Sequence, residues 1–116
     1  MIRRGDIIDV NLDPVLGSET GKTRPCVVVT NDIYNERVPV IQVVPVTAWS
    51  EKKARIKTNV TIEPSRENGL LKKSIADCLQ TRPVDKRLRF LKTRGQIKSE
   101  QMVLIDMSLK FVFGLD

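Results

Sequence analysis

Short strand-like segments, each broken within a few residues by proline, glycine or asparagine, make up most of this chain. Three of them alternate apolar with polar side chains, which is typical of strands buried on one face: 3–13, 57–63 and 74–81. Residues 26–30 form a β-branched run suited to a strand buried on both faces, and residues 39–46 form another strand. Because Pro45 cannot donate a backbone hydrogen bond, it requires an edge, a bulge or the end of that strand. A short helical turn and a last strand are expected over residues 84–91.

Only the C-terminal segment has the periodicity of a full helix. Ser99 is a candidate N-cap, and Gly114 stands just past the expected end. Apolar residues recur on one face at spacings of three and four: Met102, Ile105, Leu109 and Phe113. Five or six short strands and one terminal helix predict a mainly β fold with α, a small twisted and partly closed barrel. The helix would pack on the sheet or on a second subunit.

The remaining apolar residues of this helix are Val103, Met107 and Phe111, which lie off the first face. They fit a homodimer interface or a second face of an intramolecular core, and the pattern alone does not separate the two.

Composition limits the chemistry that such a fold can perform. The 116 residues suit one domain, 1–116, and include no histidine. The chain therefore cannot use a Ser-His-Asp triad, a Cys-His pair or imidazole ligands for zinc, and we expect no metal site. Cys26 and Cys78 lie far apart and beside apolar runs, which predicts two buried thiols in a reducing cytoplasm. With no leader and no apolar run long enough to span a bilayer, a soluble cytoplasmic domain is expected.

Positive charge is concentrated in two segments. The chain has 20 Lys and Arg residues against 14 Asp and Glu residues, a net charge of +6. Residues 51–57 carry four cations and one anion, and residues 82–94 carry six cations and one anion. Such patches favour nucleic acid or an acidic peptide as a partner, although solvated faces that only confer solubility fit the charge equally well.

A glycine-punctuated polar loop, residues 17–25, precedes the β-branched strand. Its two glycines let the backbone approach a ligand closely, and Lys22 and Arg24 bring cations to the start of the strand. Thr47, at the end of the following strand, could hydrogen-bond a phosphate oxygen or a ribose 2′-OH. Taken alone, such a loop and such a threonine are more often structural than functional.

The loop reads GSETGKTRP over residues 17–25 and is followed by a valine run and Asn31-Asp32. Together with RGDI at residues 4–7, the strand that ends in Thr47 and QTRPVDKRL at residues 80–88, it resembles the signature of the MazF/PemK toxins. The resemblance extends over nearly the whole chain.

This resemblance implies an SH3-like barrel, a homodimer and a sequence-specific endoribonuclease that cleaves single-stranded RNA and is neutralised by a cognate antitoxin. It assigns catalysis to Arg24 and Thr47, with Glu19 as the loop carboxylate. The residues expected to bind RNA are Ser18, Gly21, Lys22, Lys52, Lys53, Ser74, Gln80 and Arg82. Pro83 departs from the family pattern beside Arg82 and removes a backbone donor there.

Transesterification by the 2′-OH beside the scissile phosphate suits a chain without histidine, because the RNA supplies its own nucleophile. No metal or cofactor is then required, and the products carry a 2′,3′-cyclic phosphate and a 5′-OH. Arg24 suits transition-state stabilisation and leaving-group protonation, and Thr47 would position the 2′-OH or a phosphate oxygen. Glu19 is either a base or the partner that fixes Arg24, so the general base stays unassigned.

Two other functions fit the sequence less well. A CcdB-like toxin that poisons gyrase would not need the loop arginine together with Thr47. A non-catalytic nucleic-acid-binding SH3-like module is allowed by the charge, but an aromatic content of 4% gives it few stacking platforms.

Overall fold

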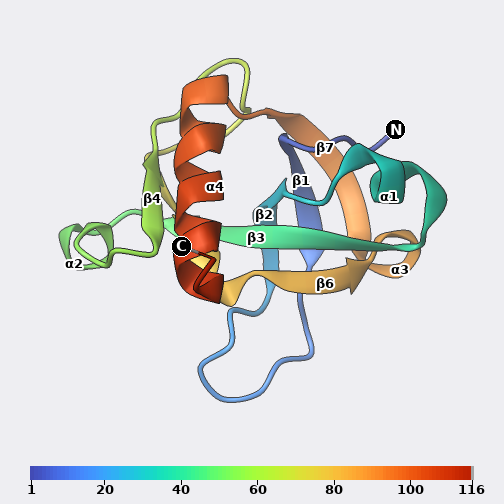
Figure 1. The fold of residues 1–116 in the computed structure, drawn as a ribbon, viewed down its shortest axis with the longest axis horizontal. Coiled ribbons are helices and arrows are strands. Elements are labelled where there is room, and N and C mark those ends of the chain that lie inside the picture. Colours follow the sequence, from blue (N-terminus) through green and yellow to red (C-terminus); the bar gives the residue numbers. More distant parts are fainter. Residues whose placement is uncertain (116) are drawn as a thin grey trace.

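The strands form one antiparallel sheet that curls without closing. The computed structural model describes residues 1–115. Within them the sheet has seven strands: β1 (Asp6–Asn11), β2 (Thr23–Val28), β3 (Val40–Ala48), β4 (Asn59–Ile62), β5 (Ser74–Asp77), β6 (Arg82–Asp85) and β7 (Phe90–Gln96). Their order is β4-β5-β3-β2-β1-β7, and β6 pairs with β3 off this path. The expected mainly β, partly open SH3-like barrel is therefore confirmed (Figure 1).

Short helices connect these strands, and one longer helix covers them. Within residues 1–115 the helical segments are α1 (Asp32–Arg37), α2 (Glu51–Ala54), the 3₁₀ turn η1 (Cys78–Gln80), α3 (Lys86–Arg89) and α4 (Ser99–Phe113). α4 lies across one face of the sheet, and α2 projects from the side opposite α1 and α3 (Figure 1). Among the described residues, none of these helices has the length and apolar character needed to cross a membrane.

β3 is shared between the two halves of the sheet, which explains how it accommodates a proline. On one edge β3 pairs with β2, where Pro45 lies opposite Cys26. On the other edge β6 pairs with β3 as far as Val43, and β5 takes over from Val46. Pro45 therefore occupies the break between two partners, where a missing N–H leaves no ladder bond unmade. The sequence alone predicts an edge, a bulge or the end of the strand at Pro45, and it does not predict this change of pairing partner.

The sheet is buried on both faces. On β1 the side chain of Ile7 joins the cluster beneath α4, whereas Ile8 and Val10 point to the opposite face, as strand alternation requires. The cluster beneath α4 consists of Ile7, Val27, Val44, Val46, Val60, Ile62, Leu70, Ala76, Cys78, Ile97 and Ile105. The opposite cluster consists of Ile8, Val10, Leu12, Cys26, Val28, Ile41, Val43 and Val84. Both thiols are buried and free, as predicted.

α4 packs on the sheet through a face that differs by one residue from the predicted one. Ile105 is fully buried, and Met102 and Leu109 pack against the same cluster. Val112 completes this face, while Phe113 is 60% exposed. The reason is geometric, because seven residues make about two helical turns and an eighth rotates the side chain away.

The two ends of α4 differ in how well they were predicted. Gly114 closes the helix in the left-handed conformation, with φ of 67°, as its position in the sequence suggested. Ser99 is not the N-cap, because it is already the first helical residue. Lys98 occupies the cap position and makes no side-chain capping bond.

Three short segments differ from the sequence-based prediction. Residues 32–37 form α1, whose cap Asn31 accepts a hydrogen bond from the Ile33 amide. Residues 51–54 of the basic segment form α2, capped by Ser50. The strand expected over 74–81 ends at Asp77 and continues as η1. Each segment is too short to show helical periodicity. Side-chain caps determine the conformation of α1 and α2, whereas η1 has no side-chain capping bond.

Candidate active site

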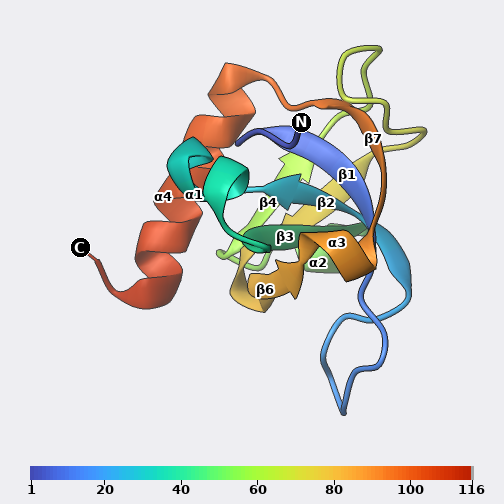
Figure 2. The same ribbon diagram turned by 90° about the vertical axis from the view of Figure 1, so that its right-hand side faces the viewer.

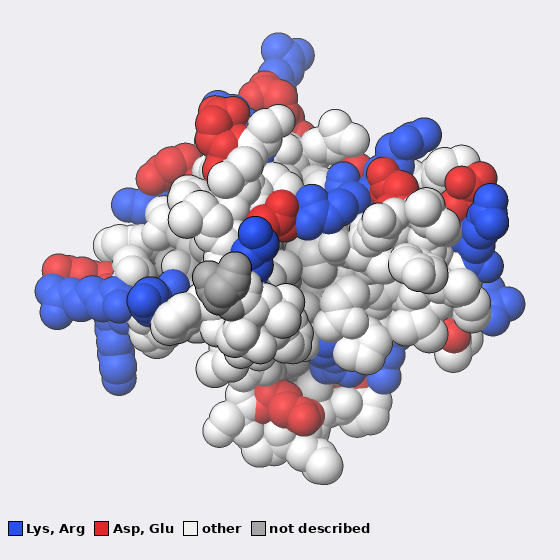
Figure 3. Space-filling model, viewed as in Figure 1, with Lys and Arg blue, Asp and Glu red and all other residues white. Residues whose placement is uncertain are grey.

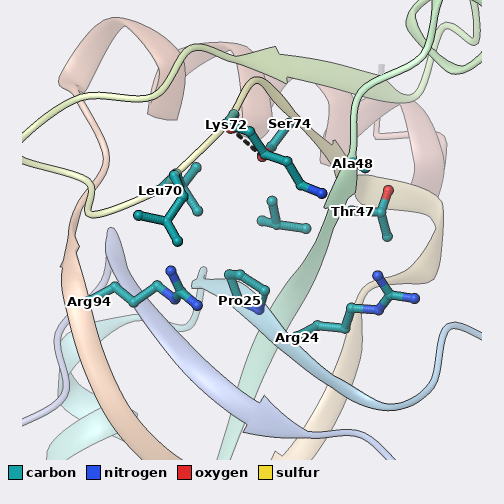
Figure 4. A pocket seen from close by; sticks show the side chains of 10 residues that line it. Arg24, Pro25, Thr47, Ala48, Leu70, Lys72, Ser74 and Arg94 are labelled. Atoms are coloured by element: carbon teal, nitrogen blue, oxygen red, sulfur yellow. Dashed lines mark hydrogen bonds between the residues drawn. The ribbon is translucent and has the colours of Figure 1, made fainter.

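One pocket brings together three of the residues that the sequence singled out. Arg24 from β2, Thr47 from β3 and Ser74 from β5 line a pocket of about 200 Å³ (Figure 4). The full lining is Arg24, Pro25, Val46, Thr47, Ala48, Leu70, Leu71, Lys72, Ser74 and Arg94. The pocket therefore lies where the start of β2, the end of β3 and the start of β5 converge, with the segment before β5 and β7 as further walls.

Arg24 is half-buried and is held by the loop that precedes it. Its Nε donates to the Gly21 carbonyl at 3.2 Å. β-pairing places Arg24 opposite Val10, and Pro25 follows it on the same strand. The guanidinium rises toward Thr47 in Figure 4, so its remaining N–H groups face the space between the two side chains.

Thr47 lies beside a lysine of α2. Its Oγ1 accepts a hydrogen bond from Lys53 Nζ at 3.4 Å, and the same ammonium donates to the Ala48 carbonyl at 3.2 Å. Lys53 is positioned by the cap of α2, because its amide donates to Ser50 Oγ at 3.1 Å. The structure thus places Lys53 next to the expected catalytic threonine, while Lys52 is exposed on the same short helix.

The loop between β1 and β2, residues 12–22, projects from the body of the protein (Figures 1 and 2). Its base is closed by Asp13, whose Oδ1 accepts from the Lys22 amide at 2.8 Å. Gly21 packs so tightly that a Cβ there would lie 2.6 Å from Asp13 Oδ1 and from Val15 Cγ2. Lys22 adopts a positive φ of 67°, which turns the chain back into β2.

Gln80 and Arg82 contact this loop rather than the pocket. The Thr20 amide donates to Gln80 Oε1 at 3.2 Å, and Gln80 Nε2 donates to the Ser18 carbonyl at 3.3 Å. Arg82 Nη1 donates to the Leu12 carbonyl at 3.1 Å. Both side chains therefore position the loop that carries Ser18 and Gly21, and neither lines the pocket.

Glu19 is exposed on the loop and does not line the pocket. Its Oε1 accepts a hydrogen bond from the Leu16 amide at 2.8 Å, closing a turn at the tip. The group that fixes Arg24 in this conformation is the Gly21 carbonyl. Of the two roles considered for Glu19, the pairing with Arg24 is therefore not among the contacts formed within residues 1–115.

Arg94 and Lys72 line the pocket but were not selected as site residues from the sequence. Arg94 belongs to the cationic segment 82–94, which the sequence does indicate as a possible binding region. The charge count of that segment does not show which of the six cations faces the pocket. Lys72 lies in a turn-rich segment, and the sequence does not predict how that segment is positioned relative to the pocket.

Cys26 lies on β2 directly after Pro25, but its thiol points into the core. Burial raises its pKa to about 12, and Asp9 adds to this effect while Arg82 and Arg24 oppose it. Burial likewise raises the pKa of Cys78. Both thiols are therefore neutral at physiological pH and unsuited to nucleophilic attack. Within residues 1–115, no cluster of three or more potential metal ligands is present.

The fold is a small, open antiparallel barrel. In its pocket an arginine and a threonine side chain converge beside a polar loop. Residues 3–113 match the family model described as PemK-like, MazF-like toxin of type II toxin-antitoxin system. The chain therefore belongs to the PemK/MazF toxin family.

Several solved structures share the fold of this chain. MazF (Form-I) from Deinococcus radiodurans superposes with a TM-score of 0.82 at 21% identity, covering 97% of this chain and 96% of that chain. The Mycobacterium tuberculosis toxin MazF-mt6 gives 0.77 at 21% identity, covering 96% and 98%. An endoribonuclease in complex with its cognate antitoxin, from Mycobacterial species, gives 0.79 at 19% identity, covering 100% and 98%.

Proposed function

We propose that residues 1–116 act as one toxin domain in the cytoplasm, a sequence-specific endoribonuclease that cleaves single-stranded RNA without a metal or cofactor. The observation that carries the proposal is the convergence of Arg24 and Thr47, from separate strands, in one pocket. Membership of the toxin family supports it, and one similar structure is itself described as an endoribonuclease.

In this proposal the ribose 2′-OH attacks the adjacent phosphorus, and the 5′-oxygen of the next nucleotide leaves. The products carry a 2′,3′-cyclic phosphate and a 5′-OH. Arg24 has N–H groups directed into the pocket, where they would bind the phosphate oxygens as negative charge develops. Thr47 would orient the 2′-OH or a phosphate oxygen, with the Lys53 ammonium adding positive charge beside it.

No group of the pocket serves as an evident general base. All three charged side chains in its lining are cationic, and an arginine stays protonated at neutral pH. Glu19 does not line the pocket, and its carboxylate accepts a hydrogen bond from the Leu16 amide. We propose that this loop and the segments around it bind the RNA through Ser18, Gly21, Lys22, Lys52, Lys53, Ser74, Gln80 and Arg82.

Replacing Arg24 tests the proposal directly. Arg24→Ala should lower cleavage of a long single-stranded RNA about 100- to 1000-fold, because removing one preorganised donor typically has that effect. Arg37→Ala is the matched control, since Arg37 is exposed on α1 and does not line the pocket. Cleavage should persist in EDTA and should stop when the 2′-OH at the cut position is replaced by hydrogen. Full activity of Arg24→Ala, or cutting of the 2′-deoxy substrate, would reject the mechanism, whereas bound but intact RNA would indicate a non-catalytic module.

We also propose that a cognate antitoxin neutralises the toxin through an acidic segment that competes with RNA for the cationic pocket. Similar structures include MazE-MazF complexes from Deinococcus radiodurans, which supports an antitoxin partner for this chain. A segment that is disordered when free would suit this role, because it could follow the groove and be displaced or degraded.

A homodimer formed through α4 completes the proposed function. The outward side of α4 exposes apolar residues: Val103, Leu104, Met107 and Phe111. Some of these line an apolar groove of about 690 Å³ between α4 and β4. Figure 3 shows this face as largely uncharged surface, with cations gathered at its edge over α2. An exposed apolar patch of this kind is typical of a subunit interface.

A further inference from the structure

Arg94 reaches the pocket from an irregularity in β7. Ile7 of β1 lies opposite Gly95 and Ile8 lies opposite Thr93, so Arg94 has no partner on β1. Such an extra residue is a β-bulge, which redirects a side chain relative to simple alternation and is common beside active sites. In Figure 4 the guanidinium of Arg94 points into the pocket, across Pro25 from Arg24.

The guanidinium of Arg94 is fixed by two contacts. Its Nε donates to Asp9 Oδ1 at 2.6 Å, and its Nη1 donates to the Gly69 carbonyl at 3.2 Å. The Asp9 side chain is only 8% exposed, so this ion pair is sheltered from water. A guanidinium has five N–H donors, and these contacts use two of them. No other acceptor within residues 1–115 takes the remaining three.

The wall beside Arg94 is rigidly packed. Gly69 adopts a φ of +68°, and a Cβ on it would lie 2.5 Å from the Arg94 carbonyl oxygen. A Cβ on Gly95 would lie 2.0 Å from the Glu67 carbonyl oxygen. The segment before β5 therefore packs directly against β7 at two glycines. The arrangement around Arg94 is thus formed before any ligand arrives.

The charge of Arg94 remains available to a ligand. Asp9 also lies 3.9 Å from Lys92 Nζ, so one carboxylate faces two cations. Within the lining, Arg24, Lys72 and Arg94 are the charged residues, and all three are positive. Arg24 and Thr47 mark one end of the pocket and Arg94 marks the other, with Pro25 between them (Figure 4). The pocket therefore offers two separate guanidinium groups to an anionic chain.

We propose that Arg94 forms a second phosphate-binding subsite, which holds a phosphate of the RNA next to the scissile one. The inference rests on the proposed ribonuclease function. With Arg24 on the scissile phosphate and Arg94 on the phosphate to its 5′ side, the backbone is held on both sides of the nucleotide that carries the attacking 2′-OH. This restrains the ribose between them and aligns the 2′-OH for in-line attack.

The test combines an enzyme variant with RNA in which one phosphate at a time is an uncharged methylphosphonate. On unmodified RNA, Arg94→Gln should lower kcat/KM about tenfold, since hydrogen bonds to charged groups are worth about that factor or more. Lys92→Gln is the matched control, because Lys92 contacts the same carboxylate from outside the pocket. It should change kcat/KM less than twofold. At one phosphate next to the scissile one, the methylphosphonate should lower the activity of the wild-type protein to that of Arg94→Gln on unmodified RNA. The same methylphosphonate should not lower the activity of Arg94→Gln any further.

The outcomes separate the subsite from the ribonuclease function. If the wild-type protein cleaves no RNA in EDTA, the proposed function fails. If it cleaves but Arg94→Gln matches wild type, or loses activity equally at every methylphosphonate position, Arg94 is only a structural partner of Asp9 and the subsite is rejected. Should Arg94→Gln fail to fold, Arg94→Lys takes its place in the same comparison, because it retains the charge beside Asp9 but not the planar fork.

Discussion

At the scale of single residues, burial of the Cys26 thiol makes the stability of the protein depend on pH in the alkaline range. The thiol pKa rises on folding from 9.0 to about 12, chiefly because the charged form would lose its hydration in the core. A folded-state pKa above the unfolded value stabilises the folded protein fully below pH 9, and this contribution is lost as the pH rises toward 12.

We therefore expect the free energy of unfolding to fall between pH 9 and 12, by about 1.4 kcal/mol for each pKa unit of the shift. Guanidinium unfolding of the wild type and of Cys26→Ala at several pH values measures the difference that belongs to this thiol. In the native state Cys26 should resist a thiol reagent at pH 8 and react after unfolding. Rapid native-state labelling, or identical pH slopes for the two proteins, would show that the thiol is accessible.

For single residues, the sequence predicts burial in strands better than it predicts which side chains line the pocket. The alternation of Ile8 and Val10 and the apolar run at Cys26 correctly indicated strands, because burial imposes a period that the residues display. Arg24 and Thr47 became candidates only through a motif, since nothing in their own neighbourhoods separates a functional side chain from a structural one. Arg94 escaped detection because its direction depends on a bulge in the β1–β7 pairing.

At the scale of elements, the loop of residues 12–22 is held by a residue that lies far from it in the sequence. Gln80 in η1 both accepts from the Thr20 amide and donates to the Ser18 carbonyl. Each such bond is worth about 0.5–1.5 kcal/mol net, enough to decide whether an exposed loop keeps one conformation. The position of the loop therefore depends on a residue 60 positions away from Thr20.

Replacing Gln80 should loosen the loop without unfolding the protein. Gln80→Ala is expected to raise the hydrogen-exchange rate of the Thr20 amide and to lower RNA cleavage about three- to tenfold, while core amides of β1 remain protected. Gln80→Glu retains an acceptor for the Thr20 amide and should give intermediate exchange. Unchanged exchange at Thr20 in Gln80→Ala would mean that the two hydrogen bonds do not set the position of the loop.

The elements that could not be predicted from the sequence share one property: local periodicity does not determine them. α1 and α2 contain six and four residues, too few for an apolar face to repeat, and they are set by the caps Asn31 and Ser50. The passage of β3 from β6 to β5 depends on partner residues 26 or more positions away in the sequence. The alternation of side chains within β3 carries no information about this change of partner. The sequence therefore predicts an edge, a bulge or a strand end at Pro45 and not a break in pairing.

At the scale of the whole molecule, the pocket and the outer surface of α4 differ in chemical character. The pocket lies where β2, β3 and β5 converge and is lined by cations, whereas the side covered by α4 presents apolar surface. Met102, Ile105 and Leu109 satisfy the sheet beneath, so the apolar residues on the outer side of α4 are not needed for the fold of one subunit. In the proposed function, RNA binds at the first of these regions and a second copy of the chain binds at the other.

A charge on the outer side of α4 should therefore separate subunits and spare the fold. Met107 is 61% exposed and lines the groove beside β4, so Met107→Glu should shift sedimentation at micromolar concentration from dimer to monomer. Leu88→Glu is the matched control, because Leu88 is 82% exposed on α3, at the other side of the molecule, and should leave the dimer intact. Thermal unfolding of the monomeric variant should lose its dependence on protein concentration, since association no longer adds to stability. Wild-type protein that sediments only as a monomer would contradict the dimer and leave the α4 surface without this role.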